Sequence, residues 1–109
     1  MALALNVFQT VTHVATTGAV GIYTAPVGYT GVVLLAQAAN VGSQTRTVSL
    51  SHKRSSTTTE IVKTLPIEAS DTANLLPGKL VLETGDSLEV SASAGSDIKF
   101  LGSILETLN

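Results

Sequence analysis

The sequence has no cysteine, no tryptophan and few charged residues, and its only aromatic residues are two phenylalanines and two tyrosines. Without cysteine, disulfides and thiolate metal sites are excluded. Charged residues make up 13% of the chain, about half of the usual share. The net charge of −2 gives no long-range attraction for nucleic acid or for an anionic membrane. We therefore expect neither partner, and a surface that is weakly protected against association.

Signals for export or membrane insertion are also missing. The first residues, Met-Ala-Leu-Ala-Leu, contain no basic side chain, and the chain turns polar at Asn6, unlike a signal peptide. No apolar run approaches the ~20 residues that span a bilayer. We expect a soluble protein made in a cytoplasm.

The residues that are present favour strands. Val, Ile, Leu, Ala, Thr and Ser dominate, and Gly, Pro, Asn and Asp interrupt them at short intervals, a pattern typical of a sandwich or barrel. We predict one all-β domain over residues 1–109, an antiparallel β-sandwich of the jelly-roll type with about eight strands and no helix. The candidate strands are residues 6–16, 20–25, 30–39, 45–52, 58–67, 79–83, 87–94 and 98–105.

Two of these strands are apolar on both faces. Most strands alternate, as in Val48, Leu50 and His52, which indicates one buried and one wet face. Residues 32–36 and 100–105 do not alternate in this way. The second apolar face needs a cover, either from the same chain or from a neighbouring subunit. The candidate interface residues are Val32, Val33, Leu34, Leu35, Leu101 and Leu105.

One short motif suggests catalysis. Gly85, Asp86, Ser87 and Leu88 spell the nucleophile block of GDSL-type hydrolases, which lies early in an α/β domain with its histidine base late in the chain. Here the block lies late between two alternating strands, and no histidine follows His52. We therefore interpret it as a hairpin turn and predict no enzyme activity.

Other site signals are weak. His13 and His52 have no partner at a spacing diagnostic of a base or metal site, and His52 is expected to be an exposed loop residue. No phosphate loop, dinucleotide loop or calcium loop is present. We predict no catalytic, metal or cofactor site.

A basic concentration and a pair of tyrosines remain. Arg46 and residues 52–54 form either a docking patch for an acidic partner or for phosphate or, as we favour, a solvated hairpin tip that protects an edge. Tyr23 and Tyr29 flank the turn at residues 26–28, where they form either a stacking platform for a sugar or ordinary packing at the end of a sandwich.

Residues 22–40, from Ile-Tyr-Thr-Ala-Pro-Val-Gly to an apolar strand ending at Asn, resemble the small β-sandwich virion proteins of tailed bacteriophages. Residues 48–51, 76–79 and 82–94 agree with this pattern of turns and strands, so the resemblance covers about residues 20–105. It implies a capsid decoration protein or a neck or tail accessory, located in the virion, and it brings no catalytic residues. Symmetric homo-oligomers are expected of such proteins.

The function expected from these observations is structural. The protein would self-assemble, or dock on a capsid, neck or tail lattice, through its apolar strand faces. The alternative is a module for carbohydrate binding or host attachment that uses Tyr23 and Tyr29.

Overall fold

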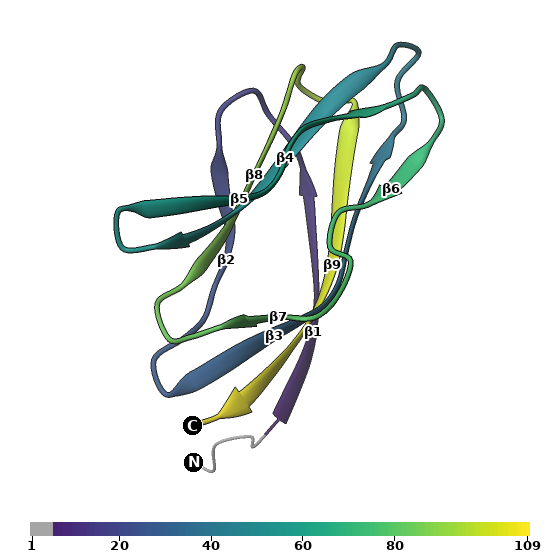
Figure 1. The fold of residues 1–109 in the computed structure, drawn as a ribbon. Coiled ribbons are helices and arrows are strands. Elements are labelled where there is room, and N and C mark those ends of the chain that lie inside the picture. The colour runs from purple at the N-terminus through teal and green to yellow at the C-terminus, as the bar shows by residue number, and fades with distance from the viewer. Residues whose placement is uncertain (1–5) are drawn as a thin grey trace.

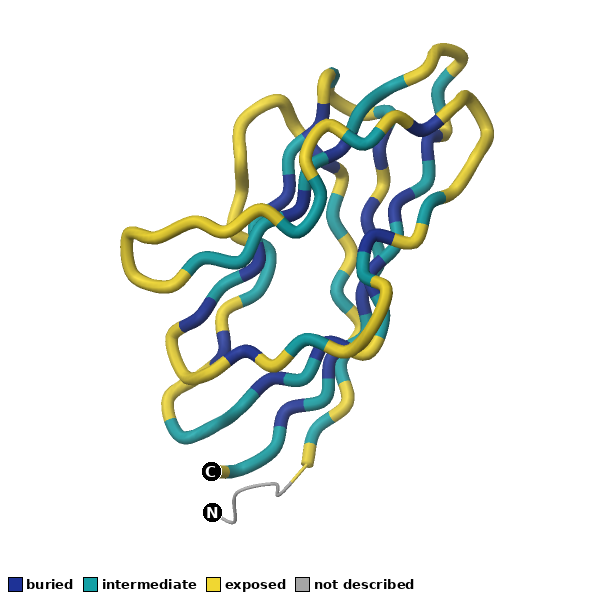
Figure 2. Tube along the Cα trace, in the orientation of Figure 1, coloured by how far each residue is buried: buried dark blue, intermediate teal, exposed yellow. Residues whose placement is uncertain are grey.

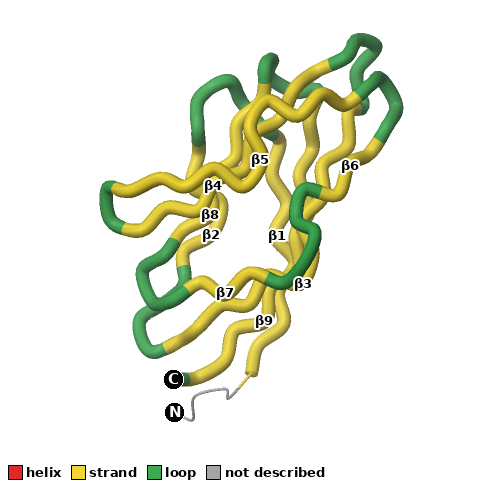
Figure 3. The backbone as a smooth tube through the Cα atoms, in the orientation of Figure 1, coloured by secondary structure: helices red, strands yellow, loops and turns green. Residues whose placement is uncertain are grey.

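Strands account for most of residues 6–109, the part of the chain that the computed structural model describes, and these residues form no helix (Figure 3). None of them therefore forms a helix long and apolar enough to cross a membrane. The all-β prediction is confirmed.

Nine strands are present in residues 6–109. They are β1 (Asn6–Val14), β2 (Val20–Thr24), β3 (Tyr29–Asn40), β4 (Arg46–Arg54), β5 (Thr57–Ile67), β6 (Thr72–Asn74), β7 (Leu80–Leu82), β8 (Ser87–Ala92) and β9 (Ile98–Leu108). Eight of them match the predicted strands, with small differences at the ends. The three-residue β6 was not predicted, because Thr-Ala-Asn is too short and too polar to be distinguished from a loop.

The strands form two antiparallel sheets that pack face to face (Figure 1). Sheet A has the order β1-β9-β3-β6, with β7 also paired to β3, and sheet B has the order β2-β8-β4-β5. Both β6 and β7 occupy the edge of β3 that β9 leaves free, so they act as one strand interrupted around Pro77. Counted as one strand, they complete the eight-stranded jelly roll. The predicted sandwich architecture is confirmed.

The core lies between the two sheets and is built from aliphatic side chains. Figure 2 shows buried and more exposed residues alternating along most strands, as expected of strands with one face against a core. Sheet A contributes Val33, Ala36, Ala38, Phe100 and Ile104, and sheet B contributes Val48, Leu50, Leu88 and Val90.

Two predicted turns use glycine at a left-handed position. Gly28 has a φ of 86° between Pro26 and Tyr29, whose N–H donates to the Pro26 carbonyl at 3.1 Å. Gly85 has a φ of 89° in the turn closed by the Asp86 N–H and the Glu83 carbonyl at 2.8 Å. Residues with a side chain rarely adopt this conformation, so glycine fixes both turns.

Candidate assembly interface

The outer face of sheet A, which points away from sheet B, carries four apolar side chains at one level of four neighbouring strands. Phe8 of β1 lies opposite Leu105 of β9, Leu105 lies opposite Val32 of β3, and Val32 lies opposite Val81 of β7. Phe8 is 75% exposed and Val81 is 54% exposed, while the two residues between them are half-buried. We call these four residues the apolar row. Contiguous exposed apolar side chains of this kind mark interaction sites in soluble proteins.

A β-bulge enlarges this surface. The register between β3 and β9 shifts between Val33 and Leu35, so Leu34 is an extra residue on β3. Leu34 is 38% exposed and lines a hollow of about 280 Å³ together with Phe8, Thr10 and Ser103. The bulge therefore places Leu34 beside the outward-facing Leu35, where strict alternation would have sent one of the two inward.

A larger hollow of about 550 Å³ lies at the other end of the same face. It is lined by Thr12, His13, Val14, Gln37, Ala39, Lys99, Phe100 and Leu101. These residues come from β1, β3 and β9, which pair side by side. The outer face of sheet A therefore changes from apolar at Phe8 to mixed polar and apolar at Lys99.

Most of the predicted interface residues lie on this face. Val32 and Leu105 belong to the apolar row, Leu101 lines the larger hollow, and Leu34 and Leu35 lie at the bulge. Their role as an interface stays a prediction, because no second chain is present in the structure. Val33 must be removed from the set: it is 1% exposed and packs in the core, since its side chain points to the opposite face from that of Val32.

The two most exposed members of the apolar row were missed from the sequence. Val81 lies in Leu-Val-Leu, where three consecutive apolar residues require one to point outward, so the signal was available. Phe8 gave a weaker signal, because β1 carries polar residues on both faces, Gln9 on one and Thr10 on the other. Only the pairing of Phe8 with Leu105 places it in the row.

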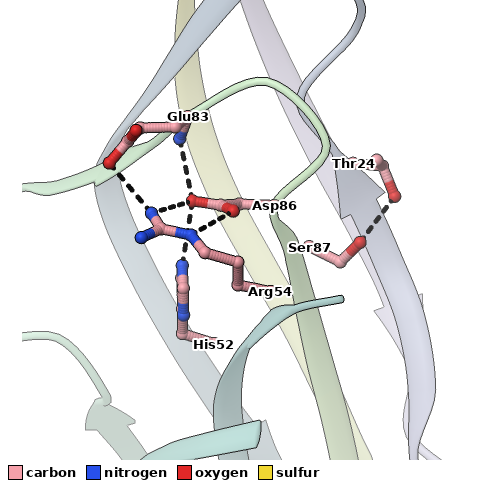
Figure 4. A network of polar contacts seen from close by, with 6 residues as sticks. All are labelled: Thr24, His52, Arg54, Glu83, Asp86 and Ser87. Carbon is pink, nitrogen blue, oxygen red and sulfur yellow. Dashed lines mark hydrogen bonds and ion pairs between the residues drawn. The ribbon is translucent and has the colours of Figure 1, made fainter. Parts of the chain in front are cut away.

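The Gly85–Ser87 segment forms a turn, as predicted, but not a hairpin, because β7 pairs in sheet A and β8 pairs in sheet B. Ser87 begins β8, and its Oγ is 2.8 Å from Thr24 Oγ1 on the neighbouring strand β2 (Figure 4). His52 is bonded to Asp86, with its Nε2 3.1 Å from Asp86 Oδ2. A serine nucleophile needs a hydrogen bond to its base, and Ser87 is paired with a threonine instead.

Asp86 is the centre of a polar network that fastens this turn to sheet B. Its carboxylate is 2% exposed and accepts two hydrogen bonds from Arg54 at the end of β4, Nε to Oδ1 at 2.8 Å and Nη2 to Oδ2 at 2.7 Å. The Glu83 N–H donates to Asp86 Oδ2 at 2.9 Å, and Arg54 Nη2 also donates to the Glu83 carboxylate at 2.9 Å. Figure 4 shows the Arg54 guanidinium between the two carboxylates, with His52 beside it. Since β7 belongs to sheet A and β8 to sheet B, the network fixes the crossing between the sheets.

The same contacts determine the charge state of Asp86. The hydrogen bonds from Arg54, together with those from His52 and the Glu83 N–H, hold the pKa of the Asp86 carboxyl well below its usual range, although burial acts in the opposite direction. Asp86 is therefore an ionised structural group at neutral pH, and His52 is its partner rather than the exposed loop residue that the sequence suggested.

The basic concentration is neutralised within the chain. Arg46 Nε lies 2.8 Å from Asp97 Oδ2, Lys53 Nζ lies 3.5 Å from Glu89 Oε2, and Arg54 is held by Asp86. These ion pairs leave little net positive charge for an acidic partner. The interpretation as a purely solvated tip is also incomplete, because Arg54 makes internal contacts.

The two histidines are not brought together. His13 lies on β1 of sheet A and His52 on β4 of sheet B. The His13 Nε2 is buried and has no hydrogen-bond partner among the described residues. In residues 6–109 no group of three or more His, Asp or Glu side chains is placed to hold a metal.

Tyr23 is a structural bridge between the sheets. Its hydroxyl donates to Glu106 Oε2 at 2.6 Å, which joins β2 of sheet B to β9 of sheet A. Gly31 lies opposite Glu106, and a Cβ on Gly31 would come within 3.0 Å of the Tyr23 hydroxyl oxygen. Burial, followed by the Glu106 carboxylate, raises the pKa of Tyr23. The ring packs against the core, and Tyr29 lies on the other sheet, at the start of β3. A role of the two tyrosines as a ligand platform stays a prediction.

The sequence matches no protein family model and no curated protein. Solved structures with the same fold exist. A chain of the acid-stable capsid of Helicobacter pylori bacteriophage KHP30 aligns with a TM-score of 0.57 and 12% identity, covering 96% of this chain and 89% of that one. A chain of the T13 viral particle of IBDV aligns with a TM-score of 0.60 and 10% identity over 97% of this chain, which corresponds to 32% of that one.

A third similar structure is not viral. A chain from Bacillus endospore appendages, described as disulfide-linked pili, aligns with a TM-score of 0.50 and 16% identity, covering 100% of this chain and 97% of that one. At these identities the three comparisons establish a shared fold.

Proposed function

We propose that the protein is a non-enzymatic structural subunit of a virus particle, a capsid decoration protein or a neck or tail component of a bacteriophage. It would assemble with copies of itself or dock on the particle lattice through the outer face of sheet A. The observation that carries this proposal is the apolar row, Phe8, Leu105, Val32 and Val81, with its exposed ends.

The fold gives independent support. Jelly rolls of two sheets are the usual architecture of viral capsid domains, although lectins share it. Two of the three similar structures come from virus particles and the third comes from an assembled appendage. Because one fold hosts many functions, the fold raises the expectation and the apolar row supplies the site.

The energetics favour a lattice over an isolated pair. Fully burying a Val, Leu or Phe side chain contributes about 1.5–3 kcal/mol, and two of the four members of the row are already half-buried. Association itself costs about 4–15 kcal/mol. The row alone therefore supports a weak contact, and a particle that repeats this contact many times converts it into a stable attachment.

The test replaces Val81 by Asp and uses Val27 as a matched control. Val27 is also an exposed valine, at 89%, but it lies in the turn between β2 and β3 and is not a member of the apolar row. We expect Val81→Asp to weaken self-association, or binding to the phage particle, at least tenfold, and Val27→Asp to leave both unchanged. Sedimentation over a concentration series and co-sedimentation with particles measure the two effects. If both variants fold and bind like the parent protein, the proposed interface is not used.

The internal contacts of Tyr23 weaken the support for the carbohydrate-binding alternative. Tyr23 uses its hydroxyl on Glu106 and its ring against the core. No specific contact in the structure favours a sugar site.

A further inference from the structure

The four edges of the two sheets differ in how they are protected against pairing with another chain. Natural edge strands are shortened, bulged, charged or interrupted by proline, because an unprotected edge pairs with any available strand. In sheet A the edge formed by β6 and β7 consists of two three-residue strands. In sheet B, β2 has only five residues, and its register on β8 shifts between Gly21 and Tyr23.

The long edge strand β5 carries several protective features. It contains Glu60, Lys63 and Pro66, and Thr64 has a left-handed φ of 49°. Its register on β4 shifts twice. A second strand cannot follow such an edge without losing hydrogen bonds.

β1 has none of these features. It runs over nine residues, Asn6–Val14, without Gly, Pro, Asp, Glu, Lys or Arg. Its register on β9 is continuous from the first pair, Asn6 with Thr107, to the last, Val14 with Lys99. Within residues 6–109 no strand pairs with its other edge.

The direction of the free backbone groups follows from one hydrogen bond. The Ala15 N–H donates to the Ile98 carbonyl at 2.8 Å, which continues the β1–β9 register. In an antiparallel pair the bonded residues alternate, so the odd-numbered residues of β1 bond to β9. The even-numbered residues direct their N–H and C=O groups to the free edge, and Thr10 is the central one.

We propose that the free edge of β1 pairs antiparallel with β1 of a second copy of this chain, about a two-fold axis at Thr10. This register pairs all nine residues of both strands and keeps outward side chains on the outward face. Thr10 faces Thr10 of the second copy, and Phe8 faces Thr12 of the second copy. A two-fold contact requires a self-complementary surface, and β1 meets this requirement because no like charges oppose each other and a Thr–Thr pair is a favourable cross-strand neighbour.

This contact is distinct from the apolar row, although it belongs to the same assembling role. The edge would join two copies of sheet A into one continuous sheet, and the outer faces of both copies would then lie on the same side. The dimer is thus a building unit, and the apolar row remains free for the lattice.

A single cysteine tests the register, because the natural sequence has none and a disulfide can therefore form only between two chains. Opposite residues in a bonded antiparallel pair have Cα atoms about 5.5 Å apart, within the range of about 4.4–6.8 Å that a disulfide spans. We expect Thr10→Cys to form a covalent dimer under mild oxidation, seen by non-reducing electrophoresis and intact mass measurement.

Thr12→Cys is the matched control, on the same strand and the same face. In the proposed register its counterpart in the second copy is four positions away along the strand, about 14 Å, too far for a disulfide. We expect at least a tenfold slower dimer formation than for Thr10→Cys. Equal rates in the two variants, or a monomer in both, would overturn the proposed pairing.

Thr10→Pro distinguishes pairing through the β1 edge from association through the outer face of sheet A. Proline removes an N–H that points to the free edge and costs no bond to β9. We expect the variant to lose the non-covalent dimer in sedimentation experiments while its melting temperature stays within a few degrees of the parent. A folded Thr10→Pro variant that dimerises with the affinity of the parent contradicts edge pairing. The Val81→Asp result tests the outer face independently, so either contact can fail without the other.

Discussion

The outer faces of the two sheets differ in polarity. On sheet B, the outward positions of β4 and β8 are hydroxyl or charged residues. Ser49 lies opposite Ser91, Ser51 lies opposite Glu89, and Lys53 forms an ion pair with that glutamate at 3.5 Å. On sheet A, the equivalent positions at one end form the apolar row.

This difference distinguishes the surfaces that stabilise the sandwich from the surface that we propose for assembly. The inner faces of the two sheets form the core of the sandwich. Sheet B also has a polar outer face, as expected of an antiparallel sheet with one side in water. The outer face of sheet A adds apolar side chains that the monomer does not need. The proposed function assigns this surplus to contact with a partner.

The largest loss of stability is expected for Asp86→Ala, which tests whether the fold depends on the polar network at the β7–β8 turn. Asp86→Ala removes the buried carboxylate that accepts hydrogen bonds from Arg54 and His52. Removing one partner of a buried pair costs about 3–5 kcal/mol, and since Arg54 is half-exposed we expect about 2–3 kcal/mol of lost stability. Urea unfolding measures the change. An unchanged midpoint would show that the network does not fix the β7–β8 crossing.

Disturbing the Tyr23–Glu106 hydrogen bond between the sheets should give the second-largest loss of stability. Gly31→Ala places a Cβ within 3.0 Å of the Tyr23 hydroxyl, which displaces the tyrosine from Glu106. We expect a loss of about 1–3 kcal/mol, the typical cost of overpacking a core, in thermal or urea unfolding. Gly21→Ala is a suitable control, because a Cβ on Gly21 meets nothing within 4 Å.

The pH dependence should report the ionised Asp86. Its pKa in the folded state is lowered from the unfolded value of about 3.9. A group of this kind stabilises the fold fully above the unfolded pKa, and its contribution is lost as the pH falls through the folded pKa. We therefore expect the free energy of unfolding to decrease as the pH drops below about 4.

Asp86→Asn is the comparison for this titration. It has no carboxylate at position 86, so its stability should fall less steeply over the same acid range. Parallel curves for the two proteins would assign the acid sensitivity to other carboxylates.

The smallest effect on stability is expected for two variants that exchange an apolar and a polar residue between the outer faces. Val81→Ser and Ser91→Val change exposed or half-exposed positions, so each should alter the free energy of unfolding by no more than about 0.5 kcal/mol. Only Val81→Ser should weaken association. An equal effect of both on association would mean that general hydrophobicity, and not the apolar row, drives it.

Much of the fold was predictable from local patterns. Alternation at Val48 and Leu50 and the glycines at positions 28 and 85 fixed the strands and turns of the sandwich. β6 was not predictable, because its three residues become a strand only by pairing with Gln37, Ala38 and Ala39. Strand pairing is a long-range property that a local window does not contain.

The candidate site was predictable in part for the same reason. Apolar runs indicated the outward faces of β3 and β9, but the β-bulge that places both Leu34 and Leu35 on the outer side depends on the register with β9. The role of Asp86 was also hidden, because its partners Arg54 and His52 lie about 30 residues earlier in the chain. The motif that contains Asp86 indicated a turn, but not the side-chain contacts that hold this turn on sheet B.

The pairing of β1 with β9 has a consequence for synthesis. β1 is made first and its partner emerges only with residues 98–108, so sheet A lacks the strand between β1 and β3 until then. Contacts so distant in sequence make folding slow compared with that of helical proteins of the same size. During translation β1 therefore exposes both of its edges, and one of them is closed only when β9 is complete. If the protein has the proposed role, a copy can assemble only after residues 98–108 have joined sheet A.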